Sequence, residues 1–295
     1  MEKELILCAD DYAQSESISA AILSLANQQR INAISCLVNM PFWHEASLDL
    51  QPIKTSHFIG LHLNLTFGQP LSAVWRAHYG EQFWPLPKLL QRAYTRQLDI
   101  TIVTAEIQAQ IDLFVQDMQI YPDFIDGHQH VQQFPVIRDA LLAIYRKQHS
   151  MVHEYSAVYP FDVHTDVEPS PCFLRKTYDD WRDLLSLQGF PKRQILALLG
   201  GITWKNRLNA GHVFTNSNFG GIYNFHASIQ YRTYFKQFLT DLKDGGLIMC
   251  HPGYDASDAL DPICAFRHHE FDYLSGDTFL QDLQDHAVQF MKKHH

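Results

Sequence analysis

Near its start the chain reads Leu5-Ile6-Leu7-Cys8-Ala9-Asp10-Asp11-Tyr12, a short apolar run that ends in two adjacent carboxylates. The run is too short for a helix and too apolar for a loop, so it predicts a buried strand. Two adjacent carboxylates repel each other, and one pKa rises unless a cation or hydrogen-bond donor lies nearby. A metal ion held by one carboxylate, with the other acting as a base, would remove this conflict. The alternative is a turn in which an aspartate caps the next helix, and this stretch alone does not decide between the two.

The segments that follow alternate helix and strand patterns. Apolar residues recur every three to four positions over 18–26, which predicts an amphipathic helix with Ser15 as its N-cap. Buried strands are predicted over 33–39 and 58–66, and a fourth strand with its terminal turn over 124–131. This alternation predicts a parallel sheet with right-handed crossovers. Functional residues of such sheets gather at the carboxyl ends of the strands.

The rest of the chain predicts further barrel units with insertions. Proline and aromatic residues over 67–100 predict a long active-site loop carrying one or two short helices. Helices are predicted over 104–118, 135–147, 181–199, 231–242 and 276–292, a short strand over 157–159, and a last buried strand over 247–253. The pattern weakens over 150–230, but no stretch resembles a linker between domains. We therefore predict one α/β domain over 1–295, with insertions around 67–100 and 150–230.

Composition limits the possible partners. The 295 residues are 46% hydrophobic, which is enough for a large core, and the net charge of −9 argues against nucleic acid or an anionic membrane surface as a partner. No apolar run approaches the ~18 residues of a transmembrane helix, and the N-terminus has no secretory signal pattern. The five cysteines are widely spaced and include no CxxC pair, which is typical of reduced thiols. We therefore expect a cytoplasmic protein that binds neither nucleic acid nor membrane.

Four predicted strands end in polar clusters, which contain Asp10 and Asp11, His62 and Asn64, Asp126, His128 and His130, and His251. A lone histidine at a strand end is more often a core or loop residue than a ligand, but four clusters converge on one rim. Imidazoles and carboxylates without thiolates suit Zn²⁺, Mn²⁺, Fe²⁺, Co²⁺ or Ni²⁺, whereas Mg²⁺ would need added waters. Such a metal would polarise a carbonyl group, a spare carboxylate could accept a proton from water, and a histidine could protonate the leaving group.

Four motifs resemble the signatures of the YdjC/ChbG-like carbohydrate deacetylases, in the family's order and spacing: Ala-Asp-Asp-Tyr at 9–12, Gly-Leu-His-Leu-Asn-Leu-Thr at 60–66, Asp-Gly-His-Gln-His-Val at 126–131 and Cys-His-Pro-Gly at 250–253. Each motif alone is weak, but the ordered four are specific. The resemblance implies an irregular, incomplete (β/α) barrel that is TIM-like and similar to polysaccharide deacetylases. It also implies removal of N-acetyl groups from amino sugars or short chitooligosaccharides, one divalent metal ion (Zn²⁺, Mg²⁺ or another transition metal), a small carbohydrate as partner, and a homodimer.

Carried over residue by residue, the resemblance implies a role for each motif. Asp11, His62 and His128 would bind the metal. Asp10 would be the general base, and His251 would be the general acid that protonates the leaving amine.

Residues beside these are candidates for support and substrate contacts. Asp126 is expected to support a ligand histidine, and His130 either faces the substrate or packs the turn. Asn39 and Asn64 either bind sugar hydroxyls or the acetamide, or they bond loop backbone. Arg175 lies in a loop-like stretch and either reaches a polar substrate or lies on the surface.

Two positions depart from the family pattern. Tyr12-Ala13 stands where relatives carry Phe-Gly. The family often has histidine two residues after the valine position of the third motif, whereas here Gln132 follows Val131. Because rim loops set specificity, Tyr12 joins the candidate substrate-binding residues. Of Trp43, Trp75, Trp84 and Trp204, at most one or two are expected to form a sugar-stacking platform.

Two other functions are weighed against deacetylation. A metal-dependent sugar isomerase or phosphoesterase on a similar barrel would be favoured by a second metal or by a Lys/Arg cluster, and no such cluster lies beside the motifs. A non-catalytic carbohydrate-binding barrel would be expected to have a broken ligand set, and here every proposed ligand is present.

Overall fold

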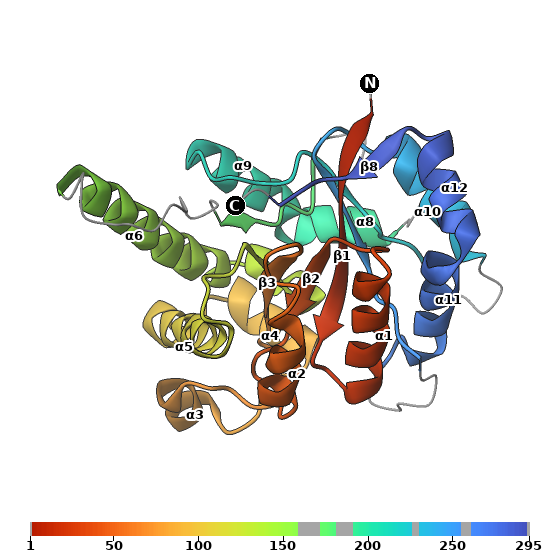
Figure 1. Cartoon of the computed structure of the whole chain (residues 1–295). Helices are drawn as coiled ribbons and strands as arrows, with labels where there is room; N and C mark the ends of the chain where they lie inside the picture. Colours follow the sequence, from red (N-terminus) through yellow and green to blue (C-terminus); the bar gives the residue numbers. More distant parts are fainter. Residues whose placement is uncertain (1, 159–171, 181–190, 226–229, 255–260, 294–295) are drawn as a thin grey trace.

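The structure is a computed structural model that describes residues 2–158, 172–180, 191–225, 230–254 and 261–293. Its centre is an all-parallel sheet whose strands run in the order β5-β4-β3-β2-β1-β7-β6, with β8 paired to β1 (Figure 1). The strands are β1 (Lys3–Tyr12), β2 (Ala33–Cys36), β3 (Phe58–Leu63), β4 (Phe124–Gly127), β5 (Phe173–Leu174), β6 (Phe219–Gly220), β7 (Gly246–Cys250) and β8 (Val288–Phe290). Within the described ranges β5 and β6 do not pair, so the sheet is a half-barrel, as the incomplete (β/α) barrel prediction requires.

Helices cover the outside of this half-barrel (Figure 1). They are α1 (Glu16–Asn27), α2 (Trp43–Leu50), α3 (Ala73–Tyr79), α4 (Leu86–Tyr94), α5 (Ile100–Met118), α6 (Ile137–Val158), α8 (Lys192–Leu196), α9 (Ile202–Ala210), α10 (Tyr231–Asp241), α11 (Cys264–Ser275) and α12 (Asp277–Asp285). Two short helical segments are the tighter 3₁₀ segment η1 (His128–Gln133) and the wider π segment η2 (Ala197–Gly201). The predicted N-cap is confirmed, because the Ser15 hydroxyl accepts a hydrogen bond from the Ile18 amide. Among the described helices, none is both long and apolar enough to cross a membrane.

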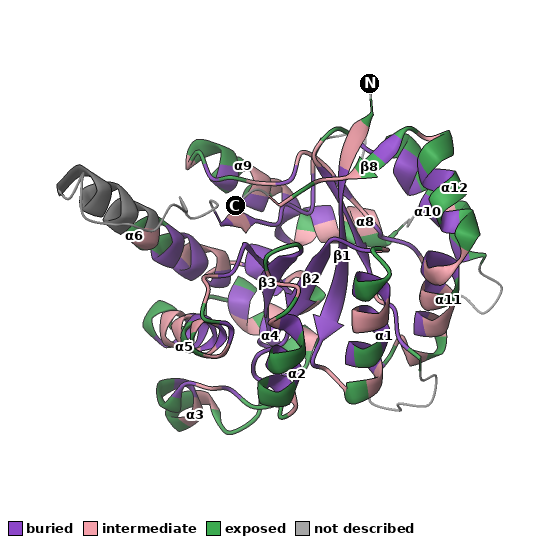
Figure 2. Ribbon diagram, viewed as in Figure 1, coloured by how far each residue is buried: buried purple, intermediate pink, exposed green. Residues whose placement is uncertain are grey.

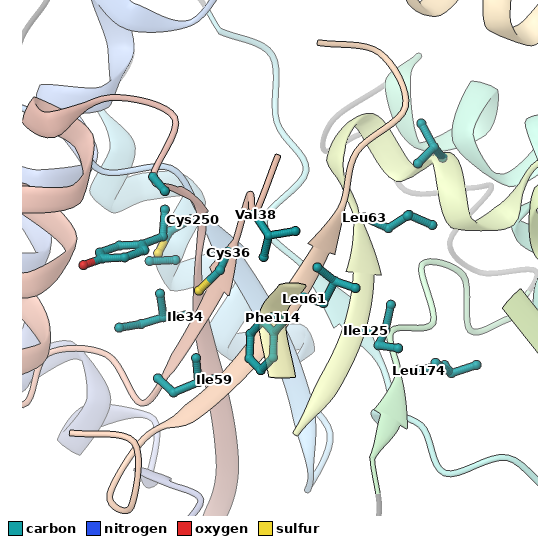
Figure 3. Close-up of a cluster of buried hydrophobic side chains, with 14 of the residues drawn as sticks. Ile34, Cys36, Val38, Ile59, Leu61, Leu63, Phe114, Ile125, Leu174 and Cys250 are labelled. Carbon is teal, nitrogen blue, oxygen red and sulfur yellow. The ribbon is translucent and has the colours of Figure 1, made fainter. Parts of the chain in front are cut away.

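The core lies where the strands meet the inner faces of these helices. Every residue of β2, β3, β4 and β7 is buried, as expected of parallel strands that are covered on both faces. Figure 2 shows this pattern, with buried strands inside and exposed outer faces on the helices. Ile34, Leu61, Phe114 and Ile125 pack in one cluster of this core (Figure 3). The parallel sheet therefore brings the carboxyl ends of its strands to one rim.

The C-terminal part differs from the prediction of one helix over 276–292. Helix α12 ends at Asp285, and Ala287 adopts a left-handed φ of 51° that breaks the helix. Residues Val288–Phe290 then form β8 beside Lys3–Leu5, where strand pairing satisfies backbone groups that a longer helix would leave open on β1.

The predicted short strand over 157–159 is also wrong for its first two residues. Ala157 and Val158 belong to α6, which continues well past the predicted end at residue 147. Residue 159 and the predicted helical stretch 181–190 lie outside the described residues. The insertion at 67–100 holds the two short helices α3 and α4, within the predicted one or two.

Trp75 is the centre of an aromatic cluster under this insertion. Its fully buried ring lies 5.1 Å from the Tyr79 ring, 5.3 Å from Phe83 and 5.9 Å from Trp84, measured between centroids. We expect Trp75→Ala to lower the free energy of unfolding by ~3–5 kcal/mol, because it removes buried area and leaves a cavity. Urea denaturation followed by circular dichroism measures this loss. Val74→Ala is the matched control, since Val74 is 46% exposed; equal losses in both variants would show that the cluster lies outside the cooperative core.

Candidate active site

Asp10 and Asp11 lie near the carboxyl end of β1, where its pairing register with β2 shifts. Ala9 pairs with Ile34 and Tyr12 with Cys36, so one strand has an extra residue at this point. Such a bulge re-aims side chains beside functional sites. Asp11 has a φ of 70° and Ala13 a φ of 71°, the left-handed region that non-glycine residues adopt at a cost of about 1–2 kcal/mol. Ala13 therefore keeps a backbone shape that the glycine of relatives would take freely.

Asp11 meets two histidines from other strand ends. Its Oδ1 atom lies 2.9 Å from His128 Nδ1 on η1 and 3.4 Å from His62 Nε2 on β3. One ligand atom from each of the three residues lies within 4.8 Å of the others. The three residues predicted as metal ligands are thus brought together by three separate strands.

The orientation of His62 is fixed by polar groups behind it. His62 Nδ1 lies 2.6 Å from Asp126 Oδ1, and the Ser35 hydroxyl donates to the same carboxylate oxygen at 2.6 Å. Burial lowers the pKa of His62, but the charge of Asp126 and hydrogen bonds to Asp11 and Asp126 outweigh it and raise that pKa to about 10. Nδ1 is therefore committed to Asp126, and Nε2 is left facing Asp11. The contact between Asp126 and His62 is the one expected of a carboxylate that supports a metal-binding histidine.

Arg175 holds Asp10 in place. From the sequence, we expected Arg175 either to lie on the surface or to reach a polar substrate. That expectation is wrong: Arg175 is fully buried, and its Nη1 and Nη2 donate to Asp10 at 2.6 and 2.7 Å. Nη2 also lies 2.5 Å from Asp126 Oδ2, an ion-pair contact without hydrogen-bond geometry. Burial raises the pKa of Asp10, but the charge and hydrogen bonds of Arg175 prevail and lower it to about 2. Two buried carboxylates require such a cation, and Asp10 stays ionised near neutral pH.

His251 follows β7 and faces Asp10 across the rim. Its Nε2 lies 4.0 Å from Asp10 Oδ2. The backbone amide of His251 donates to Glu270 Oε2 at 2.6 Å, and the Tyr223 hydroxyl donates to Glu270 Oε1 at 2.5 Å. The imidazole is thus placed through its backbone, by a carboxylate on α11.

Arg267 is a site residue that the sequence did not reveal. Its Nη2 donates to Asp11 Oδ2 at 2.7 Å, and its Nε pairs with Asp261. A Cβ on Gly253 would lie 3.0 Å from Arg267 Cδ, so the glycine of the fourth motif makes room for this side chain. No local signal could have found Arg267, because it lies on α11, 256 residues away from Asp11 in sequence.

Tyr12, predicted to contact substrate, lies in the core instead. Its ring is fully buried, and its hydroxyl donates to the Ala46 carbonyl at 2.9 Å. Asp10 and Tyr12 would share one face of a regular strand, but the bulge between Ala9 and Tyr12 changes the face that each terminal side chain takes. Of the four tryptophans named as stacking candidates, none lines the cavity described below, and Trp43, Trp75 and Trp204 are almost completely buried.

Asn39 and Asn64 support a loop, which was the second of the two interpretations for them. Asn64 Nδ2 donates to Asn39 Oδ1 at 2.9 Å and to the Phe67 carbonyl at 2.7 Å. Asn64 Oδ1 accepts from the amides of Thr66 and Phe67. The pair thereby fixes the loop whose Thr66 and Phe67 line the cavity.

A cavity of about 450 Å³ opens over these groups. Asp10, Asp11, His62, His128, His251 and Arg267 line its polar side. His130 also lines it, with its ring edge-on to Phe219 at 5.8 Å, and burial lowers the pKa of this imidazole to about 3. Of the two possibilities for His130, facing the cavity is the one observed.

The fold and site define a class: a (β/α) half-barrel with an aspartate–histidine cluster at the carboxyl ends of its strands. The chain belongs to the YdjC-like protein family, whose sequence profile matches residues 4–285.

Curated relatives share part of this length. A chitooligosaccharide deacetylase of Yersinia enterocolitica is 27% identical over 189 residues, which is 62% of this chain and 69% of the relative. A chitooligosaccharide deacetylase of Yersinia pestis is 28% identical over 154 residues, which is 50% of this chain and 58% of the relative. The chain thus aligns with between 58% and 69% of the length of these two relatives.

A solved structure matches the fold over nearly the whole chain. It is an Enterococcus faecalis V583 protein provisionally described as a cellobiose-phosphate cleavage protein. The match has a TM-score of 0.68 at 17% identity and covers 99% of this chain and 97% of the other. At this identity the likeness establishes the fold alone.

Proposed function

We propose that this chain is a metal-dependent hydrolase that removes N-acetyl groups from amino sugars or short chitooligosaccharides. The observation that carries the proposal is the cluster of Asp11, His62 and His128 beside Asp10, which Arg175 holds and which lies 4.0 Å from His251. The curated relatives, named chitooligosaccharide deacetylases, support the same reaction class.

The donor set fits one divalent cation. Asp11, His62 and His128 each offer one ligand atom, and these atoms lie within 4.8 Å of one another, while Asp126 holds the other ring nitrogen of His62 as in many metal-bound histidines. Two imidazoles and one carboxylate, without a thiolate, suit Zn²⁺ or another transition metal better than Mg²⁺. When bound, such a cation supplies Lewis acidity toward an amide carbonyl and an incoming water.

The residues around this cluster are placed to accept and donate the protons of amide hydrolysis. Asp10 is ionised near neutral pH, so it can accept a proton from water. His251 faces Asp10 and can donate a proton to the departing amine nitrogen. Both side chains line the cavity, where the substrate amide would lie.

The alternative of a two-metal phosphoesterase has less support. A second group that could hold a cation contains Cys8, Asp10 and Asp126, all buried. The Arg175 guanidinium already pairs with both of these carboxylates. A fixed cation therefore takes the place that a second metal ion would need.

The experiment is a mass-spectrometric screen of N-acetylated sugars for acetyl loss, with and without added divalent metal. We expect acetate release that depends on the metal, and we expect Asp10→Asn to lower kcat by ~10²–10⁴, the usual contribution of a general base. Metal binding, measured by calorimetry, should survive in Asp10→Asn. Asp49→Asn, on the exposed part of α2, is the matched control and should keep full activity. Full activity of Asp10→Asn, or no acetate from any sugar, would contradict the proposal.

A further inference from the structure

Both insertions of the barrel turn apolar side chains toward the cavity. Helix α4 contributes Leu86 and Leu90, and the α8–η2 segment contributes Ile195, Leu196 and Leu199. We call these five side chains the aliphatic wall. Ile195 is 50% exposed and the other four are partly exposed, so part of their apolar surface is uncovered, although Leu86, Leu90 and Leu199 also pack against the core. Uncovered apolar surface inside a binding cavity marks the place of an apolar ligand group.

One half of the aliphatic wall is tied firmly to the catalytic rim. Gln133, the last residue of the turn that begins with His128, donates Nε2 to the carbonyls of Leu196 at 3.1 Å and Leu199 at 3.4 Å. Gly200 has a φ of 120°, and a Cβ there would lie 2.5 Å from the Gln133 carbonyl oxygen. This close backbone contact fixes the wall beside the candidate metal ligands, so the apolar surface is preformed.

The cavity lining therefore has two chemically different parts. The polar side carries Asp10, Asp11, His62, His128 and His251, which can orient an amide. The aliphatic wall offers no side-chain donor or acceptor, so a sugar hydroxyl placed against it would lose its hydrogen bonds to water without replacement. An alkyl group placed there gains affinity, by about fourfold for each buried methylene.

We propose that the preferred substrate is an amphiphilic N-acylated amino sugar, with an apolar group of several carbons against the aliphatic wall and its amide at the polar side. The inference rests on the proposed deacetylase function. The reaction is unchanged: water cleaves the amide C–N bond to give a carboxylic acid and an amine. The apolar group is either an N-acyl chain longer than acetyl or an alkyl group on the anomeric oxygen. Either source would place an alkyl chain against the aliphatic wall.

Two pairs of synthetic substrates separate the sources. The first pair is the methyl and hexyl glycosides of N-acetylglucosamine, and the second is N-acetyl- and N-hexanoylglucosamine. With the metal-loaded protein, we expect the long compound of one pair, the hexyl glycoside or N-hexanoylglucosamine, to exceed its short partner in kcat/KM by at least about tenfold, mainly through a lower KM. The pair that shows the gain identifies the source. Equal or lower values for both long compounds would overturn the inference.

Variants of the wall test whether it causes the preference. Leu90→Asn and Leu199→Asn should each reduce the long-over-short ratio to within about threefold, because each places an amide against the alkyl group. Leu198→Asn is the matched control, since Leu198 is 72% exposed and does not line the cavity. It should keep both the activity and the ratio. An unchanged ratio in both wall variants would assign the preference to another surface.

Binding distinguishes failure of this inference from failure of the proposed function. If no compound is hydrolysed, the proposed function fails, and calorimetry with both pairs of compounds still tests the wall. In at least one pair, binding of the long compound at least about tenfold tighter than that of its short partner, with the difference lost in Leu199→Asn, supports an apolar ligand group there. Equal binding within both pairs overturns it.

Discussion

Asp11→Ala is expected to abolish divalent-metal binding and to lower kcat/KM for acetyl release by at least ~10³, more than the loss from removing a single electrostatic donor. Asp11 Oδ1 is the atom that both His62 Nε2 and His128 Nδ1 approach, so its removal leaves two imidazoles without a shared anionic partner. The substitution also frees Arg267, whose Nη2 donates to Asp11 Oδ2. Calorimetric titration with Zn²⁺ or Co²⁺ measures the first effect, and acetate detection measures the second.

His128→Ala provides the second half of this test. It removes a proposed ligand but leaves the Asp11–Arg267 ion pair in place, and His128 is not fully buried. The matched control is His44→Ala, because His44 is an exposed histidine whose ion pair with Asp117 lies on α2 and α5. The control should bind metal and release acetate as the native protein does. Native metal affinity in both Asp11→Ala and His128→Ala would show that the cluster is not the metal site.

Arg175→Met is expected to lower the free energy of unfolding by ~3–5 kcal/mol, because it leaves buried carboxylates without their cation. Arg175 is fully buried and contacts both Asp10 and Asp126. The same change should raise the pKa of Asp10, since burial then acts against its charge without opposition from the guanidinium. Amide hydrolysis should fall as well, because a protonated Asp10 cannot accept a proton.

Urea denaturation measures the expected loss in the free energy of unfolding, and Arg232→Gln is the control variant. Arg232 also forms a two-point pair with a buried carboxylate, Asp282, but the Arg232 side chain is itself 48% exposed. When Arg232 is removed, Asp282 keeps the Tyr273 hydroxyl as a donor and Lys236 at 4.0 Å, so the control should lose less stability than Arg175→Met. A loss in Arg175→Met no larger than in Arg232→Gln would show that the buried pair is not required. A double variant that adds Asp10→Asn should recover part of the loss, because one of the unpaired charges is then absent.

Strand periodicity and strand ends could be predicted from sequence because their signals are local. The apolar run before Asp10 and Asp11 became β1, and the motifs around His62, His128 and His251 sit at the ends of β3, β4 and β7. A parallel sheet places all carboxyl ends on one rim, so convergence follows from topology alone. The incomplete barrel, and the choice of Asp11, His62 and His128 as the residues that meet, came instead from the resemblance to the family.

The cations of the site could not be predicted, because their partners are distant in sequence. Arg175 reaches Asp10 across 165 positions, and Arg267 reaches Asp11 across 256. An isolated arginine in a loop-like stretch looks like any surface arginine until the buried carboxylates are placed. The misassignment of Tyr12 has a different cause, since the bulge in β1 changes which face each terminal side chain takes.

The pairing of β8 with β1 has a consequence for the order in which the protein is made. The strand that carries Asp10 and Asp11 leaves the ribosome long before two of its partners, residues 246–250 and 288–290. Until those residues are made, the backbone of β1 is paired on one side at most, by β2. Contacts of such high sequence separation form slowly, so the rim that carries Asp10 and Asp11 is expected to assemble only after residues 288–290 have been made. An unpaired apolar strand in the nascent chain is a natural target for chaperones and a point at which aggregation can begin.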